Sequence, residues 1–395
     1  MGKLPLLFFR LMISRILLGI SFGAFTIFYL WYIVFYFKEV FLTGMVPTIY
    51  LASSLIVSVP IGHLLDKFNS TKIGFYASLM AMLPVIILFF QNSLEFIYIS
   101  TAILSVAFTM KGDSFSASTK KHLDETQFHS ASSYTFIASN VSSLSGTLIG
   151  GVCVSYFPQY FIYILTAIVI LSISLSLPTK EISNGKSDES RGSGIISSIS
   201  FYKKMIGFLL VGFTINGLFE SLDVYSSGLF HLVLHSQPIY YTMFVVVISI
   251  GGISGSFVTK TWPSIGSNGK RISFFIFLFS PILLGIGISP SPFIDIILSF
   301  SLGILLPLIN VPLTAKLMAI IPREIFGKVM AFLRIFISGS TPLMAAFFSF
   351  VSLWSPVNFI FIYIGLIMIP VTALSFAVIP KFLSIQSGNA LENPV

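Results

Sequence analysis

Two carboxylates stand out because they lie inside a long apolar segment, residues 205–231. Glu220 and Asp223 are three positions apart, which places both on one face of a helix, and Asn216 lies on that face one turn earlier. Ionisable groups in apolar helices are costly and by default mark functional sites. Neighbouring carboxylates that are removed from water also favour each other's protonated form. We therefore expect the pair to bind and release protons, with Glu220 near the middle of the segment and Asp223 nearer water.

Other polar side chains fall in further apolar segments. Lys111 and Asp113 lie in the segment 96–118, where they could pair with each other or with another helix, and Asp113 is a third candidate for proton binding. Arg15 and Arg334 lie within one or two turns of one membrane face, so their long stems could also snorkel to water. The side chains that we expect to bind substrate or to gate its passage are Arg15, Lys111, Asn140, Asn216, Asn310 and Arg334.

Metal and enzyme chemistry have little support in the sequence. His231 and His235 have an i, i+4 spacing but no third ligand, so we expect no metal site. The nucleotide-binding string G-x-x-x-x-G-K-[ST], the zinc-protease string H-E-x-x-H and the hydrolase string G-x-S-x-G do not occur. Asp295, at the start of the segment 293–318, is interpreted as a solvated charge at a helix start. We expect neither an enzyme nor a bound cofactor.

The composition shows which elements must position these groups. Of the 395 residues, 55% are hydrophobic and only 9% are charged, whereas a soluble domain has about 25% charged residues. The chain must therefore face lipid, where a backbone satisfies its own hydrogen bonds as a helix or a closed barrel. Continuous runs of about 20 apolar residues indicate helices. We predict twelve membrane spans: 11–37, 44–61, 73–91, 96–118, 130–155, 159–178, 205–231, 238–258, 272–289, 293–318, 329–353 and 357–379.

The basic residues orient these spans. If the N-terminus is cytoplasmic, all of the 22 Lys and Arg residues except Lys38 lie on or near the inner side. Cytoplasmic loops carry an excess of Lys and Arg, so the sorting predicts twelve spans with both termini in the cytoplasm. The net charge of +8 follows from this topology and does not indicate a nucleic-acid partner.

A hydrophilic stretch divides the chain into near-equal halves. Residues 179–204 are rich in Ser, Gly and charge, which indicates a flexible cytoplasmic linker. We predict an N-terminal six-helix bundle (1–178), a C-terminal six-helix bundle (205–380) and a cytoplasmic tail (381–395). Two repeated bundles are typical of transporters that hold substrate near the midplane between the halves.

The loop after the second segment, residues 62–72, reads GHLLDKFNSTK. It resembles the signature loop of the major facilitator superfamily, G-x-L-a-D-[RK]-x-G-[RK]-[RK]. Gly62, Leu64, Asp66 and Lys67 match in place, whereas Ser70 and Thr71 replace the paired basic residues and Lys72 follows one position late. Asn69 replaces the second glycine and tolerates a left-handed backbone.

Two further stretches are similar to patterns of drug-exporting branches of that superfamily. Residues 322–329 resemble the loop P-x-x-x-x-G-[RK]-V before helix eleven. Asn140, Gly146 and Gly150 resemble the pattern N-x(5)-G-x(3)-G on helix five. The resemblance covers the whole chain as architecture and about a tenth of it as motif.

The resemblance implies a twelve-helix secondary transporter in the cell membrane, a monomer that exports drugs or metabolites by alternating access with proton coupling. Its partners would be a small-molecule substrate, protons and the lipid bilayer, without nucleic acid. It also implies that Asp66, with Gly62, Lys67 and Lys72, forms an inner gate. The first span has Arg15 but no acid, so proton coupling would have to use the acids of other spans.

Two alternatives remain open. One is uptake of a small nutrient or organic anion, with Arg15, Lys111 and Arg334 as a cationic site. The other is a polytopic membrane enzyme or sensor, which would need a catalytic cluster or a soluble signalling domain.

Overall fold

The structure, a computed structural model, describes residues 5–123, 125–179, 195–261, 268–320, 333 and 336–384. These residues form helices and turns and contain no strand. Within them, ten helices are long and apolar enough to cross a membrane. The prediction of an all-helical, multi-pass membrane protein is therefore confirmed.

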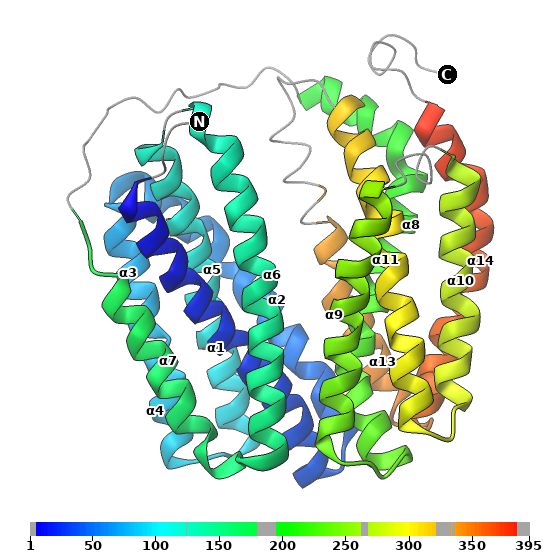
Figure 1. Cartoon of the computed structure of the whole chain (residues 1–395), viewed down its shortest axis with the longest axis horizontal. Helices are drawn as coiled ribbons and strands as arrows, with labels where there is room; N and C mark the ends of the chain where they lie inside the picture. The colour runs from blue at the N-terminus through cyan, green and yellow to red at the C-terminus, as the bar shows by residue number, and fades with distance from the viewer. Residues whose placement is uncertain are drawn as a thin grey trace. The chain divides into compact units, whose positions relative to one another are not determined.

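The chain folds into two compact units. The first unit contains the helices before the hydrophilic stretch, together with Gln237–Thr242. Its helices are α1 (Leu6–Phe37), α2 (Val40–Lys67), α3 (Ser70–Met80), α4 (Met82–Phe90), α5 (Leu94–His122), α6 (Glu125–Tyr156), the 3-10 turn η1 (Pro158–Tyr160) and α7 (Phe161–Leu175) (Figure 1).

The second unit contains the helices after the hydrophilic stretch, except the start of α9 up to Thr242, which belongs to the first unit. These are α8 (Ile195–Gly228), which continues as the π-helical turn η2 (Leu229–Val233), then α9 (Pro238–Thr261), α10 (Gly269–Ile288), α11 (Pro292–Ile320), α13 (Ser340–Val351) and α14 (Val357–Ser384). Each predicted span overlaps at least one of the helices in the two units. Part of the predicted span 329–353 lies outside the described residues.

Several helices extend beyond the apolar segments that predicted them. α2 ends six residues after its predicted span, at Lys67, and α8 begins at Ile195, inside the stretch predicted as linker. Hydropathy detects only the part of a helix that crosses hydrocarbon, whereas backbone hydrogen bonding continues into polar turns. The segment 73–91 is instead divided between α3 and α4 at Ala81. Pro84 explains the break. It has no backbone N–H to donate to the carbonyl of Met80, and its ring clashes with that carbonyl.

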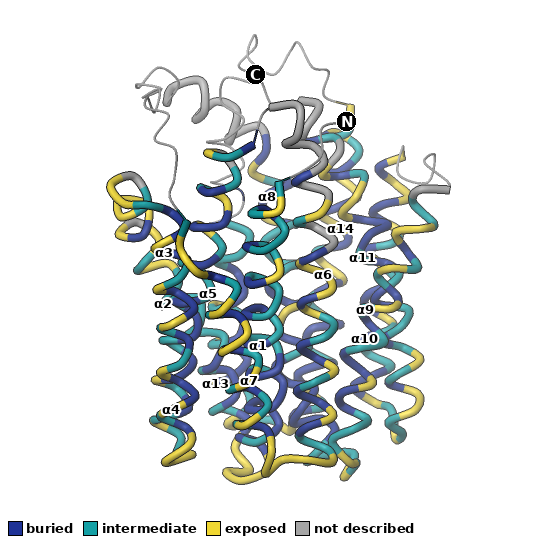
Figure 2. The backbone as a smooth tube through the Cα atoms, turned by 60° about the vertical axis from the view of Figure 1, so that its left-hand side comes forward, coloured by how far each residue is buried: buried dark blue, intermediate teal, exposed yellow. Residues whose placement is uncertain are grey.

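Exposed positions recur along the helices of each unit (Figure 2). Many of them are large apolar side chains, such as Ile56, Phe90, Ile170 and Phe257. A soluble protein rarely exposes apolar surface on this scale, and lipid is the solvent that such side chains match.

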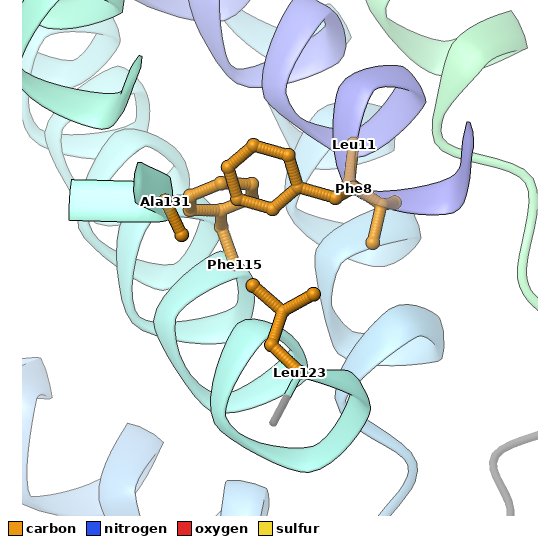
Figure 3. Close-up of a cluster of buried hydrophobic side chains, with 5 residues drawn as sticks. All are labelled: Phe8, Leu11, Phe115, Leu123 and Ala131. Carbon is orange, nitrogen blue, oxygen red and sulfur yellow. The ribbon is translucent and has the colours of Figure 1, made fainter. Parts of the chain in front are cut away.

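A buried hydrophobic cluster joins three helices near one end of the first unit (Figure 3). Phe8 and Leu11 come from α1, Phe115 from α5, Leu123 from the end of α5 and Ala131 from α6. The rings of Phe8 and Phe115 are 5.5 Å apart between centroids. This cluster fixes the position of α1 against α5, and therefore the position of the polar side chains next to it on both helices.

Candidate functional site

Glu220 and Asp223 lie on α8, within the candidate span Met205–Val233. Glu220 is 15 residues from one end of that span and 13 from the other, so it is close to the middle. The two carboxylates are three residues apart on this helix, a spacing that places both on one face. Neither carboxylate accepts a hydrogen bond from another described side chain. Both acids are therefore on one helix, and their role in proton binding stays a prediction.

The relative exposure of these acids differs from the expectation. The side chain of Glu220 is exposed, whereas that of Asp223 is only partly so. The sequence predicted the opposite order, because Asp223 is nearer the end of the segment. Exposure along α8 is set by which of its faces neighbouring helices cover and not by depth alone. Glu220 is consequently the more exposed acid of the pair.

Asn216 connects α8 to the segment that leads into α13. Its Nδ2 donates to the carbonyl of Ile337 at 3.1 Å and lies 3.3 Å from the Ser340 hydroxyl and 3.4 Å from that of Thr341. These contacts occupy the amide donors. The geometry therefore favours a role for Asn216 in positioning α8 over a role as substrate ligand.

Two more contacts hold α8 against α13. A Cβ added at Gly217 would lie 2.9 Å from the carbonyl oxygen of Ser340, so the two helices approach closely there. Two turns later, the buried Tyr225 hydroxyl donates to the carbonyl of Ala345 and lies 3.2 Å from the Ser349 hydroxyl. α8 is thus fixed in rotation, and the face with the two acids keeps one orientation within its unit.

In the first unit, Lys111 and Asp113 point to different surroundings. Lys111 is 2% exposed, and its ammonium donates to oxygens of Gly74, Ser78 and Ser176. Asp113 is exposed and acts electrostatically on Arg15. Positions 111 and 113 are about 200° apart around a helix, so the predicted alternative in which these two residues pair is wrong.

Arg15 packs on α5 in a regular antiparallel register. Its guanidinium carbon lies 5.3 Å from the ring centroid of Phe115. Phe22 of α1 stacks on Phe108 of α5, with ring centroids 5.1 Å apart. Phe22 is seven residues after Arg15, and Phe108 is seven residues before Phe115. A cation over an aromatic face is stabilised by the ring quadrupole. The half-buried Arg15 therefore has a defined place beside Asp113 and is not only a snorkelling side chain.

The signature loop lies where α2 passes into α3. Gly62, Lys67 and Lys72 are exposed, and no atom lies within 4 Å of a Cβ added at Gly62. Asp66 is in the last turn of α2, and its side chain lies outside the described part of the structure.

The departures of this loop from the family pattern have structural roles. Asn69 has φ −61° and is not left-handed; it caps α3 instead, since its Oδ1 accepts from the N–H groups of Thr71 at 2.8 Å and Lys72 at 3.1 Å. Its Nδ2 donates to the carbonyl of Thr179 at 3.1 Å, and the N–H of Thr179 donates to the Thr71 hydroxyl at 3.2 Å. The loop therefore holds the chain that follows α7.

The remaining candidates differ in how well they are placed. Asn140 on α6 and Asn310 on α11 are both exposed within their helices, as a substrate ligand requires. Arg334 lies outside the described residues.

Asp295 corrects an expectation. It is 0% exposed, although the sequence indicated a solvated charge. Among the described residues the Ser289 hydroxyl acts on this carboxylate, but neither carboxylate oxygen has a partner at ordinary hydrogen-bond geometry. α11 packs against α10, and hydropathy does not show which positions of a helix such packing covers.

The sequence profile described as Major Facilitator Superfamily matches residues 11–340. A search of curated proteins found no match.

Several solved structures have the same fold. A bacterial homolog to the human lysosomal transporter Spinster, inward-facing and unoccupied, superposes with a TM-score of 0.74 at 11% identity over 100% of both chains. The nucleoside transporter NupG gives a TM-score of 0.73 at 14% identity over 95% of this chain and 99% of its own. The peptide transporter POT in complex with sulfate gives 0.74 at 13% identity over 97% and 96%.

Proposed function

The chain belongs to the Major Facilitator Superfamily, and from that membership we propose that it is a secondary transporter that moves a small molecule by alternating access. The observation that carries a more specific proposal is the acid pair of α8, with Glu220 exposed near the middle of a membrane span. A carboxylate in that position changes its protonation state when its surroundings change. We propose that transport is proton-coupled and that a drug or metabolite is exported.

Uptake of an organic anion on a cationic site has less support. That function needs the ammonium of Lys111 to face the substrate, but Lys111 is buried and bonded to three oxygens of its own unit. Of the three cations in that proposed site, Arg15 already has an aromatic and an acidic neighbour. The accessible acids therefore support proton exchange better than these cations support anion binding.

Proteoliposomes that contain the purified chain test this proposal. We expect saturable counterflow of at least one member of a panel of amphipathic drugs and metabolites. An acidic lumen should drive its accumulation if protons leave as substrate enters, whereas an acidic exterior should drive it if both move together. The sign of the effective gradient therefore separates export by antiport from uptake by symport. If no panel member exchanges faster than in empty liposomes and none changes the proton flux, the proposal is contradicted.

We propose twelve spans with both termini in the cytoplasm. The overlap of every predicted span with a helix supports this number, as does the sorting of the basic residues. The only cysteine, Cys153, is buried, so Cys153→Ala provides a background for single labels. A cysteine at the exposed Gln91 should react with an impermeant reagent only from outside, and one at the exposed Lys270 only from the cytoplasmic side. Labelling of both from one side would contradict this topology.

We propose that Asp66, with Gly62, Lys67 and Lys72, forms the inner gate. Asp66→Asn should shift the balance between inward- and outward-facing states, since a contact present in one state changes the equilibrium by its own energy, about 1.5–3 kcal/mol for a charged hydrogen bond. The measurement is the rate at which a cytoplasmic reagent labels a cysteine placed at the exposed Ser139. Glu95→Gln is the control for loss of a charge, because Glu95 is an exposed acid in the first turn of α5 and lies outside this loop. A labelling rate and transport rate equal to those of wild type would leave Asp66 as a turn residue.

A further inference from the structure

The ammonium of Lys111 lies in an oxygen-lined pocket inside the first unit. Nζ is 3.2 Å from the carbonyl oxygen of Gly74, 2.9 Å from the Ser78 hydroxyl and 2.5 Å from the Ser176 hydroxyl. Gly74 and Ser78 are on α3, and Ser176 caps the end of α7. One side chain of α5 therefore bonds to both of these helices.

A second row of serines surrounds these oxygens. The Ser78 hydroxyl lies 3.4 Å from that of Ser172 on α7, which lies 3.2 Å from that of Ser14 on α1. Ser14 and Ser172 also donate to each other's carbonyl oxygens, at 2.7 Å and 2.8 Å. All four serines are 0% exposed. The pocket is thus closed to solvent and built from hydroxyl and carbonyl oxygens.

The charge in this pocket is balanced by dipoles. No carboxylate contacts Lys111 among the described residues, and Asp113 points elsewhere on α5. An ammonium has three N–H donors and no acceptor, and the three oxygens match those donors in number. Burial of a cation is costly unless its donors are satisfied, and the three hydrogen bonds of Nζ offset part of that cost. Neutral hydroxyl and carbonyl oxygens are also hard ligands of the type that small hard cations take.

We propose that the oxygens of Gly74, Ser78 and Ser176 form a monovalent-cation site, and that the chain fills this site with the tethered ammonium of Lys111. The ammonium holds α3, α5 and α7 together from within the unit, in the way that a bound ion would. This role is independent of the proposed transport function and makes Lys111 a structural cation, not a substrate ligand.

Removal of the ammonium should make the full-length protein dependent on an added cation. In detergent with tetramethylammonium chloride, which has no N–H and is too large for the pocket, Lys111→Ala should unfold several degrees below wild type. Sodium, potassium or ethylammonium chloride at the same ionic strength should restore most of that loss. Wild type should unfold at the same temperature in all four salts, because its site is filled.

The pocket serines supply the matched controls. In the Lys111→Ala background, a further Ser176→Ala change should abolish the recovery, whereas Ser174→Ala should keep it, since the exposed Ser174 hydroxyl bonds only to its own helix at Leu171. With Lys111 intact, Ser78→Ala and Ser176→Ala should each lower the unfolding temperature and Ser174→Ala should not, so the proposal stays testable even if Lys111→Ala does not fold. An unfolding temperature of Lys111→Ala that is the same in all four salts, or pocket variants as stable as Ser174→Ala, would overturn it.

Discussion

Glu220→Gln is expected to abolish accumulation of substrate driven by a pH gradient while leaving exchange of substrate at equal concentrations at least partly intact. Glutamine has the size and shape of a protonated glutamate but cannot release a proton. Glu220 is exposed near the middle of its span, so its carboxylate can meet water or substrate when the transporter changes state. The measurement compares gradient-driven accumulation with counterflow in the same proteoliposome preparation.

Three variants bracket this result. Asp223→Asn should reduce accumulation less, because Asp223 is less exposed than Glu220 and exchanges protons less readily. Glu95→Gln is the control for loss of an acid, since Glu95 is an exposed residue in the first turn of α5, bonded to Ser93 at 2.8 Å. Asn216→Ala should lower stability by loosening α8 from Ile337 and α13, without removing the pH dependence. If Glu220→Gln still concentrates substrate with an unchanged response to pH, Glu220 is not the proton carrier.

Gly150→Ala is expected to destabilise the first unit, because the added methyl group would clash with the backbone of a neighbouring helix. A Cβ at Gly150 would lie 2.5 Å from the carbonyl oxygen and 2.9 Å from the Cα of Ala24 on α1. Both atoms are backbone, so the clash is relieved only if α1 and α6 move apart. Overpacking of this kind costs about 1–3 kcal/mol or more. The expected result is a lower unfolding temperature in detergent and a lower yield of folded protein.

Gly112→Ala is the matched control for this experiment. Gly112 lies within α5, and no atom is within 4 Å of an added Cβ. The extra methyl group should therefore be neutral or stabilise the helix by about 0.5–1 kcal/mol, the usual preference of a helix for alanine over glycine. Equal stability of the Gly150 and Gly112 variants would show that α1 and α6 are not in close contact at Gly150.

The positions of the helices could be predicted from the sequence because a segment that crosses lipid must meet two simple requirements. A span needs about 20 apolar residues in a row and must be helical to satisfy its backbone, and each predicted span overlaps a helix. The acid pair on α8 was predictable for a similar reason, since residues three apart on a helix are neighbours whatever surrounds them. The break at Ala81 could also have been predicted from Pro84, although the hydropathy of the segment gives no sign of a break there.

Properties that depend on which helix faces become covered could not be predicted in this way. Serine has little effect on hydropathy. Ser78 and Ser176 lie 33 and 65 positions away from Lys111, so nothing in the sequence connects these serines with that lysine. Asp295 is likewise buried on α11, which packs against α10. Composition and local spacing therefore determine which segments are helices and which residues share a face. Only the packing of helices distant in sequence decides which oxygens surround a cation and which acids remain accessible, because those contacts join residues that have no local relation along the chain.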